Sequence, residues 1–205
     1  MCFSATASFV ASGGLVALSG ASFIAAKKED KIIAVIPLMF GIQQALEGIQ
    51  WLYLNNGSSS LFAGYCFLFF AFIVWPIYAP SFIFIIDKKR REFLKKFIIL
   101  GIAVAIYSVG VVLTKSLSIH ELGKCVNYSF DYSLGWFLTT LYLIAVFGPF
   151  FASSLKILKL FGAIFAFFAI ISWILFKVNF VSVWCFFAAI VSSMFFLYIK
   201  FKNRI

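Results

Sequence analysis

The chain alternates long apolar runs with short polar connections. Each run is near or above the length of about 20 residues that crosses the hydrocarbon core of a bilayer as a helix. No connection is long enough to form a soluble domain. The pattern predicts an all-α membrane protein, a bundle of seven transmembrane helices that forms a single domain over residues 1–205. The predicted spans are Ser4–Ala26, Ile32–Leu54, Leu61–Ile86, Phe97–Thr114, Ser133–Ala152, Leu160–Phe176 and Val181–Ile199.

Lysine and arginine are distributed unevenly over the connections. The connections after the first, third and fifth spans, together with the C-terminal end, hold 14 of them. The opposite side holds only Lys115, Lys124 and Lys177. Short cytoplasmic loops of membrane proteins carry an excess of these two residue types. We therefore expect a protein of the cell membrane with its N-terminus outside and its C-terminus in the cytoplasm.

Composition excludes a soluble protein and argues against a nucleic-acid partner. Hydrophobic residues make up 64% of the chain and charged residues 12%, whereas soluble domains are about half apolar and a quarter charged. The net charge of +10 would suit nucleic acid, but the basic residues cluster between apolar runs and form no extended basic face. We expect the lipid bilayer as partner and no nucleic acid, and an oligomer or a partner protein is left open.

All four prolines, Pro37, Pro76, Pro80 and Pro149, lie inside predicted spans. Proline removes a backbone donor and bends a helix, which membrane proteins tolerate where neighbouring groups satisfy the freed carbonyl. Ordinary kinking is one interpretation of all four. A hinge or a cavity lining is the other interpretation for Trp75-Pro76 and Pro80 in the third span.

The second span contains Glu47, the one acidic residue that lies within a predicted span. A carboxylate there costs a few kcal/mol unless it is paired, protonated or hydrated, so it is a functional candidate by default. Gln43, Glu47, Gln50 and Trp51 share one helical face, and Gln44 borders it. Such side chains face the bundle interior or a wet cavity. We predict a ligand-binding site at Gln43, Gln44, Glu47 and Trp51, and a purely structural role for the glutamines is left open.

The Glu47 carboxyl is expected to contact polar groups of at least one other helix, because it cannot face lipid at low cost. The first and last spans offer small polar groups at a similar depth. The preferred neighbours are Ser4, Ser8, Ser182 and Cys185, with Tyr65 and Cys66 of the third span next.

The predicted topology places all four cysteines toward the non-cytoplasmic side. Three interpretations are open. The thiols are small buried hydrophobes, the common state of free cysteine; or some form disulfides, with Cys2–Cys125 as first choice; or thiolates join Glu47 in a metal or redox site. The third interpretation gives Glu47, Cys185 and Cys2 as candidate metal ligands. The chain has no Cys-x-x-Cys or His-x-x-x-His pair, and its single histidine, His120, lies in a predicted outward loop.

Several motifs together resemble a bacterial multi-pass membrane protein family of uncharacterised function. They are Met1-Cys2-Phe3-Ser4-Ala5, Phe40-Gly41-Ile42-Gln43-Gln44 followed by Glu47-Gly48 and Trp51, the pair Trp75-Pro76, and Val181-Ser182-Val183-Trp184-Cys185-Phe186-Phe187-Ala188-Ala189. The resemblance implies a protein of the bacterial inner membrane. It singles out Cys2, Gln43, Gln44, Glu47, Trp51 and Cys185 and implies no activity.

Two classes of function follow from these residues. The first is binding or transport of a small ligand or cation at an outward-opening polar pocket around Glu47, because hard oxygen ligands neutralise positive charge. The second is a membrane-embedded metal- or thiol-dependent enzyme that uses Glu47 with Cys185 or Cys2. A transition metal is therefore left open as cofactor. The chain has no hydrolase nucleophile elbow, phosphate-binding glycine loop or dinucleotide fingerprint.

Overall fold

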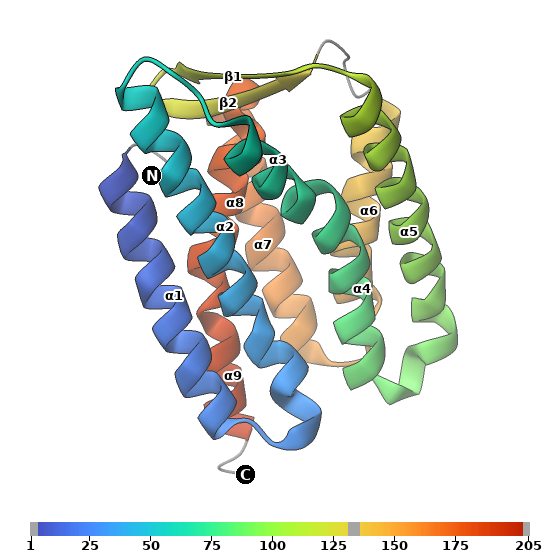
Figure 1. Cartoon of the computed structure of the whole chain (residues 1–205). Helices are drawn as coiled ribbons and strands as arrows, with labels where there is room; N and C mark the ends of the chain where they lie inside the picture. Colours follow the sequence, from blue (N-terminus) through green and yellow to red (C-terminus); the bar gives the residue numbers. More distant parts are fainter. Residues whose placement is uncertain (1–3, 131–135, 203–205) are drawn as a thin grey trace. The chain divides into compact units, whose positions relative to one another are not determined.

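The computed structural model describes residues 4–130 and 136–202, and these residues are predominantly helical (Figure 1). The α-helices are α1 (Ala5–Ala25), α2 (Lys31–Asn55), α3 (Leu61–Phe69), α4 (Trp75–Ile86), α5 (Arg91–Thr114), α6 (Trp136–Ala152), α7 (Lys156–Leu175), α8 (Phe180–Ser192) and α9 (Met194–Lys202). Single turns of 3₁₀-helix form η1 (Lys28–Asp30), η3 (Lys88–Arg90) and η4 (Lys177–Asn179), and a π-helix forms η2 (Phe70–Val74). Two strands, β1 (Leu117–Leu122) and β2 (Cys125–Phe130), pair as a two-stranded sheet.

The predicted helical segments are confirmed, with shifted ends. Six helical segments of the described chain are long and apolar enough to cross a membrane, and the seventh, Phe137–Ala152, is shorter. The fourth segment begins at Arg91, six residues before the predicted Phe97, and α8 and α9 together replace the predicted last span. The membrane crossing itself, the orientation of the termini and the count of seven spans stay predictions.

The chain folds into two compact units. Unit 1 comprises Met1–Phe67, Ile119–Tyr128 and Phe168–Ile205, and unit 2 comprises Leu68–Ser118 and Ser129–Phe167. The expectation of a single domain is not tested by this division and stays a prediction.

In unit 1, α1 lies along α2, and α8 and α9 also pack on α2 (Figure 1). Two glycines of α2 permit the close approach of α1. A Cβ atom at Gly48 would lie 2.9 Å from the Phe9 ring, and one at Gly41 would lie 3.0 Å from Val16 Cγ2. Small residues at such contacts are typical of helix packing in membranes. The Ser19 hydroxyl adds a hydrogen bond of 2.7 Å to the Ala34 carbonyl.

In unit 2, the π-helix η2 interrupts the long segment of α3 and α4 just before Pro76. The Trp75 N–H donates to the Phe70 carbonyl, five residues back. In the same five-residue register, the backbone N–H of residue 76 would donate to the Ala71 carbonyl, but residue 76 is a proline and has no N–H. The Tyr142 hydroxyl of α6 donates to Ala71 O instead, at 2.7 Å. The freed carbonyl therefore has a donor from a neighbouring helix, as membrane helices require.

The same proline lies at a close crossing with α5. A Cβ atom at Gly101 would overlap the Pro76 carbonyl oxygen, so only glycine fits at this position of α5. The π-helix before Pro76 and the substitute donor from Tyr142 together explain why Trp75-Pro76 is accommodated inside a helical segment.

The connection between the predicted spans Phe97–Thr114 and Ser133–Ala152 contains a β-hairpin, which the pattern of apolar runs did not predict. Gly123 and Lys124 form its turn, and both have positive φ (59° and 60°). Two such residues favour a tight turn whose twist matches that of paired strands. The alternation of buried Leu117 and Ile119 with exposed residues was the sequence signal for β1.

Candidate functional site

The polar side chains of α2 are buried in the interior of unit 1. Gln43, Gln44, Glu47 and Gln50 have no exposed surface, and Trp51 is 2% exposed. Their burial follows from the position of α2, which is covered by α1, α8 and α9. The sequence-based expectation that this face points into the protein is confirmed.

Glu47 is bound by α8. The Ser182 hydroxyl donates a hydrogen bond to Glu47 Oε1. The prediction that a small polar group of the last span contacts this carboxyl is therefore confirmed. A buried carboxylate requires such donors because burial without them is costly.

A second contact ties the same two helices together one turn away. Cys185 follows Ser182 by three residues and lies on the same side of α8, and Gln43 precedes Glu47 by four on α2. The Gln43 amide donates to Cys185 Sγ at 3.3 Å and also to the Phe67 carbonyl at 3.5 Å. Gln43, Glu47, Ser182 and Cys185 thus form one polar cluster, and Gln43 connects it to the end of α3 within unit 1.

Other polar atoms of this interior have no hydrogen-bond partner in the part of the chain that the structure describes. They are both amide atoms of Gln44, both amide atoms of Gln50, the Ser8 hydroxyl and the indole N–H of Trp51. Polar groups buried in proteins are normally satisfied by protein, by ordered water or by a ligand. This set offers both acceptors and donors to such a molecule.

The hairpin covers the end of unit 1 at which α8 begins (Figure 1). The Asn127 amide donates to the Val178 carbonyl at 2.8 Å and to Asn179 Oδ1 at 3.2 Å. The Asn179 amide donates in turn to the Leu122 carbonyl at 2.8 Å. We call these two asparagines the hairpin latch.

Cys125 is the first residue of β2 in the hairpin, and its side chain is fully buried against Val183 and Phe186. Burial raises the pKa of its thiol, and the negative charge of Glu47 raises it further. Cys125 thus packs against residues of α8 that adjoin Ser182 and Cys185, although the sequence motifs did not single it out. The packing of a connecting hairpin on α8 is a tertiary contact with no signal in the sequence.

The described residues of the predicted site are all buried in the same unit. Gln43, Gln44, Glu47, Trp51 and Cys185 all lie in the interior of unit 1, whereas Cys2 lies outside the described residues. The thiols of Cys66, Cys125 and Cys185 are free. Within residues 4–130 and 136–202, no group of three His, Cys, Asp or Glu side chains could hold a metal ion. Because the proposed metal set includes Cys2, that set stays a prediction.

The family model described as "Family of unknown function (DUF6629)" matches residues 1–205. The chain belongs to the DUF6629 family. The match covers the entire chain, so the two units and the hairpin all lie within the family's extent. No match was found among curated proteins or among solved structures. Function must therefore be argued from the site itself.

Proposed function

We propose that this protein binds a small cation or a protonated small solute in the interior of unit 1 and transports it across a membrane. The observation that carries the proposal is the set of buried side-chain atoms of Ser8, Gln44, Gln50 and Trp51 that lack a partner among the described residues. Gln44, Gln50 and Trp51 lie three or four residues from Glu47 on α2, and Ser8 is a buried residue of α1, which packs on α2.

The chemistry of these groups suits a positively charged ligand. A carboxylate supplies the compensating charge, and the amide oxygens of Gln44 and Gln50 are neutral hard donors. A charge in a membrane interior is unfavourable by several kcal/mol unless such groups replace its hydration. The Trp51 ring adds an aromatic wall of the kind that attracts cations. We propose that the ligand enters from the non-cytoplasmic side, beneath the hairpin.

The test uses the purified full chain and compares Glu47→Gln with Glu29→Gln. Glu29 is an exposed carboxyl in η1 and gives a matched loss of one negative charge. The probes are Na⁺, K⁺, methylammonium and Ca²⁺, each measured against a bulky organic cation by thermal denaturation. A saturating ligand should raise the melting midpoint of wild type and Glu29→Gln by several degrees, since about 1 kcal/mol corresponds to roughly 2–4 °C for a chain of this size.

Glu47→Gln should fold, because the Ser182 hydroxyl can still donate to the amide oxygen, and it should lose the shift. A cation that stabilises Glu47→Gln as much as wild type contradicts the proposal, as does a wild type that responds to none of the four probes. Uptake of labelled methylammonium into vesicles that contain the protein then separates transport from binding.

A second candidate is a metal- or thiol-dependent enzyme. The observation in its favour is the pair of buried thiols near Glu47, one of which, Cys185, accepts a hydrogen bond from Gln43. Stoichiometric zinc, copper or iron in purified protein that disappears in Cys185→Ala would favour the enzyme. Metal-free protein that folds normally would count against it.

We also propose a seven-span topology in a bacterial inner membrane, with the N-terminus outside. The uneven distribution of lysine and arginine supports it, and so does the position of the start of α1 and the end of α9 at opposite ends of unit 1 (Figure 1). Reporter fusions in the loop 87–96 and after residue 205 should both report the cytoplasm. An external reading at the C-terminus would overturn the topology.

A further inference from the structure

The turn between α4 and α5 in unit 2 is the most basic segment of the chain. Within Asp87–Lys96 there are six basic and two acidic residues, a net charge of +4. The turn joins two helical segments that are each long and apolar enough to cross a membrane, Leu61–Ile86 and Lys88–Thr114. If both segments span, the turn lies where the hydrocarbon ends and the lipid headgroups begin. The basic residues are Lys88, Lys89, Arg90, Arg91, Lys95 and Lys96.

Both acidic side chains of the turn are occupied, Asp87 by uncharged hydroxyl and backbone N–H donors and Glu92 by a lysine. The Asp87 carboxyl is 2% exposed and accepts from the Ser153 hydroxyl at 2.8 Å and from the Ser154 N–H and hydroxyl at 2.6 and 2.7 Å. Glu92 is exposed and pairs with Lys95 at 2.9 Å. Among the described residues Lys88 and Lys89 have no ion pair. The positive charge of the turn is therefore largely uncompensated.

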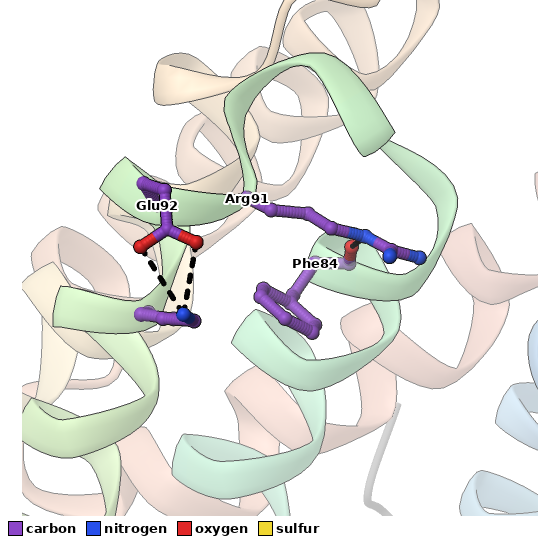
Figure 2. A network of polar contacts seen from close by, with 4 residues as sticks. Phe84, Arg91 and Glu92 are labelled. Atoms are coloured by element: carbon purple, nitrogen blue, oxygen red, sulfur yellow. Dashed lines mark hydrogen bonds and ion pairs between the residues drawn. The ribbon is translucent and has the colours of Figure 1, made fainter.

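Arg91 is held in place by uncharged partners. Its Nε donates to the Phe84 carbonyl at 3.3 Å and its Nη2 to the Ile85 carbonyl at 3.4 Å, and the guanidinium lies 5.3 Å from the centre of the Phe84 ring. Figure 2 shows Arg91 reaching back over Phe84, on the side away from Glu92. Carbonyls and a ring orient the guanidinium without neutralising it, and a guanidinium has five N–H donors, so several remain for an anion.

The basic side chains border a hollow. A cavity of about 600 Å³ is lined by Lys88, Lys89, Arg90, Arg91, Glu92 and Phe93. Phe93 lines this hollow and is 47% exposed, and aromatic side chains are favoured at the boundary between lipid and water. Arg90 is tied to the end of α6 by a hydrogen bond of 3.3 Å to the Ala152 carbonyl. The hollow thus has oriented cationic groups and one apolar rim.

We infer that this hollow binds the phosphodiester headgroup of an anionic phospholipid, with Arg91 as the oriented donor and Lys88 and Lys89 as flexible cations. A row of basic residues directly beside a membrane span attracts anionic lipid, and a guanidinium can donate two parallel hydrogen bonds to one phosphate. The position between two apolar spans and the exposed Phe93 favour a lipid over a free phosphate, because acyl chains then have apolar helices beside them. This site is independent of the function proposed for unit 1.

The test measures the dissociation constant of short-chain phosphatidylglycerol for the full chain in neutral detergent by native mass spectrometry. Phosphatidylcholine serves as the uncharged comparison and inorganic phosphate as the free-anion comparison. The variant Lys88→Gln/Lys89→Gln/Arg91→Gln removes three charges from the hollow. The matched control Lys27→Gln/Lys28→Gln/Lys31→Gln removes three charges from exposed residues of another loop on the same predicted side. A third variant, Arg91→Lys, keeps the charge and removes the planar guanidinium.

Wild type and the control variant should prefer phosphatidylglycerol over phosphatidylcholine. The triple variant of the hollow should bind phosphatidylglycerol roughly one hundred times more weakly, at about fivefold for each lost charge. Arg91→Lys should be weakened several-fold. Equal weakening in the control variant would overturn the site, since net charge alone would then explain binding. Saturation by inorganic phosphate at the same concentration as lipid would overturn the lipid as ligand, and wild-type binding by Arg91→Lys would overturn the role of Arg91.

Discussion

The Tyr142 hydroxyl donates to the Ala71 carbonyl, the group that Pro76 leaves without its donor in the π-helical register. We expect Tyr142→Phe to lower the free energy of unfolding by about 1–2 kcal/mol, because a buried carbonyl then loses its partner. In a Pro76→Ala background the cost of Tyr142→Phe should fall, since the new backbone N–H can take the carbonyl. Denaturant titration in mixed micelles measures all four proteins of this cycle.

Tyr53→Phe is the control for this cycle, because Tyr53 is 47% exposed and its loss should change stability by less than about 0.5 kcal/mol. An equal cost of Tyr142→Phe with and without Pro76 would show that the hydroxyl does not compensate for the proline.

Gly101→Ala should be strongly destabilising, because its Cβ would overlap the Pro76 carbonyl oxygen. Overpacking against backbone cannot be relieved by a side-chain rotation, so we expect a loss of about 2–3 kcal/mol. Gly110→Ala, in the same helix, is the matched control: outside its own stretch of helix backbone, no described heavy atom lies within 4 Å of its added Cβ. It should be neutral or more stable by up to about 1 kcal/mol. Similar effects at both positions would contradict the close crossing of α4 and α5.

Asp87→Asn should destabilise unit 2 in a pH-dependent way. Burial by itself raises the pKa of Asp87, but hydrogen bonds from Ser154, Ser153 and the Lys89 N–H outweigh it, so the pKa lies below the ordinary value of 3.8. A carboxyl whose pKa is lowered by folding stabilises the folded state at pH values above its ordinary pKa. This stabilisation is lost as the pH falls through the lower pKa of the folded state. At pH 7 we expect a loss of about 2 kcal/mol.

The difference between wild type and Asp87→Asn should therefore shrink below about pH 4, as measured by unfolding between pH 7 and pH 2.5. Glu92→Gln removes an exposed ion pair and should cost less than about 1 kcal/mol at any pH. A pH-independent effect of Asp87→Asn would show that the carboxylate charge is not what stabilises the turn.

Asn179→Ala should expose Cys125 by weakening the hairpin latch. Cys125 is fully buried, and both burial and the charge of Glu47 raise its pKa, so its reaction with N-ethylmaleimide at neutral pH should be slow. Loss of the Asn179 hydrogen bonds should make local opening more frequent by about tenfold, which corresponds to about 1.4 kcal/mol. Peptide mass spectrometry of Cys125 over time gives the rate.

Asn56→Ala is the control, because the exposed Asn56 amide bonds to Leu52 O at 2.8 Å and lies outside the latch. In Asn179→Ala and in Asn56→Ala alike, the rate of Cys125 labelling should rise with pH, since the thiolate is the form that reacts with N-ethylmaleimide. Equal labelling rates of Asn179→Ala and wild type would show that the hairpin opens without breaking the latch.

The prediction of the candidate site from the sequence reached Glu47 and its neighbours in α2 but not the hairpin. An ionisable residue in an apolar span is unfavourable against lipid, and that one fact predicts that it faces inward. Ser182 was among the expected partners because it is small, polar and near the same end of its span. Cys125 and the latch could not be foreseen, because a connection of polar and apolar residues can fold over any part of the protein.

The sequence alone determined the helical segments, the inward face of α2 and the expected orientation in the membrane. These three features follow from local chemistry: the length of apolar runs, the spacing of polar residues on α2 and the distribution of basic residues. The tertiary structure alone decided the π-helix before Pro76, the donor from Tyr142, the closeness of Gly101 to Pro76 and which of the expected partners, Ser182, contacts Glu47. Each of these depends on which residues far apart in the chain meet, and at what register. Periodicity predicts only which face of a helix is buried, whereas close packing decides which atoms lie against it.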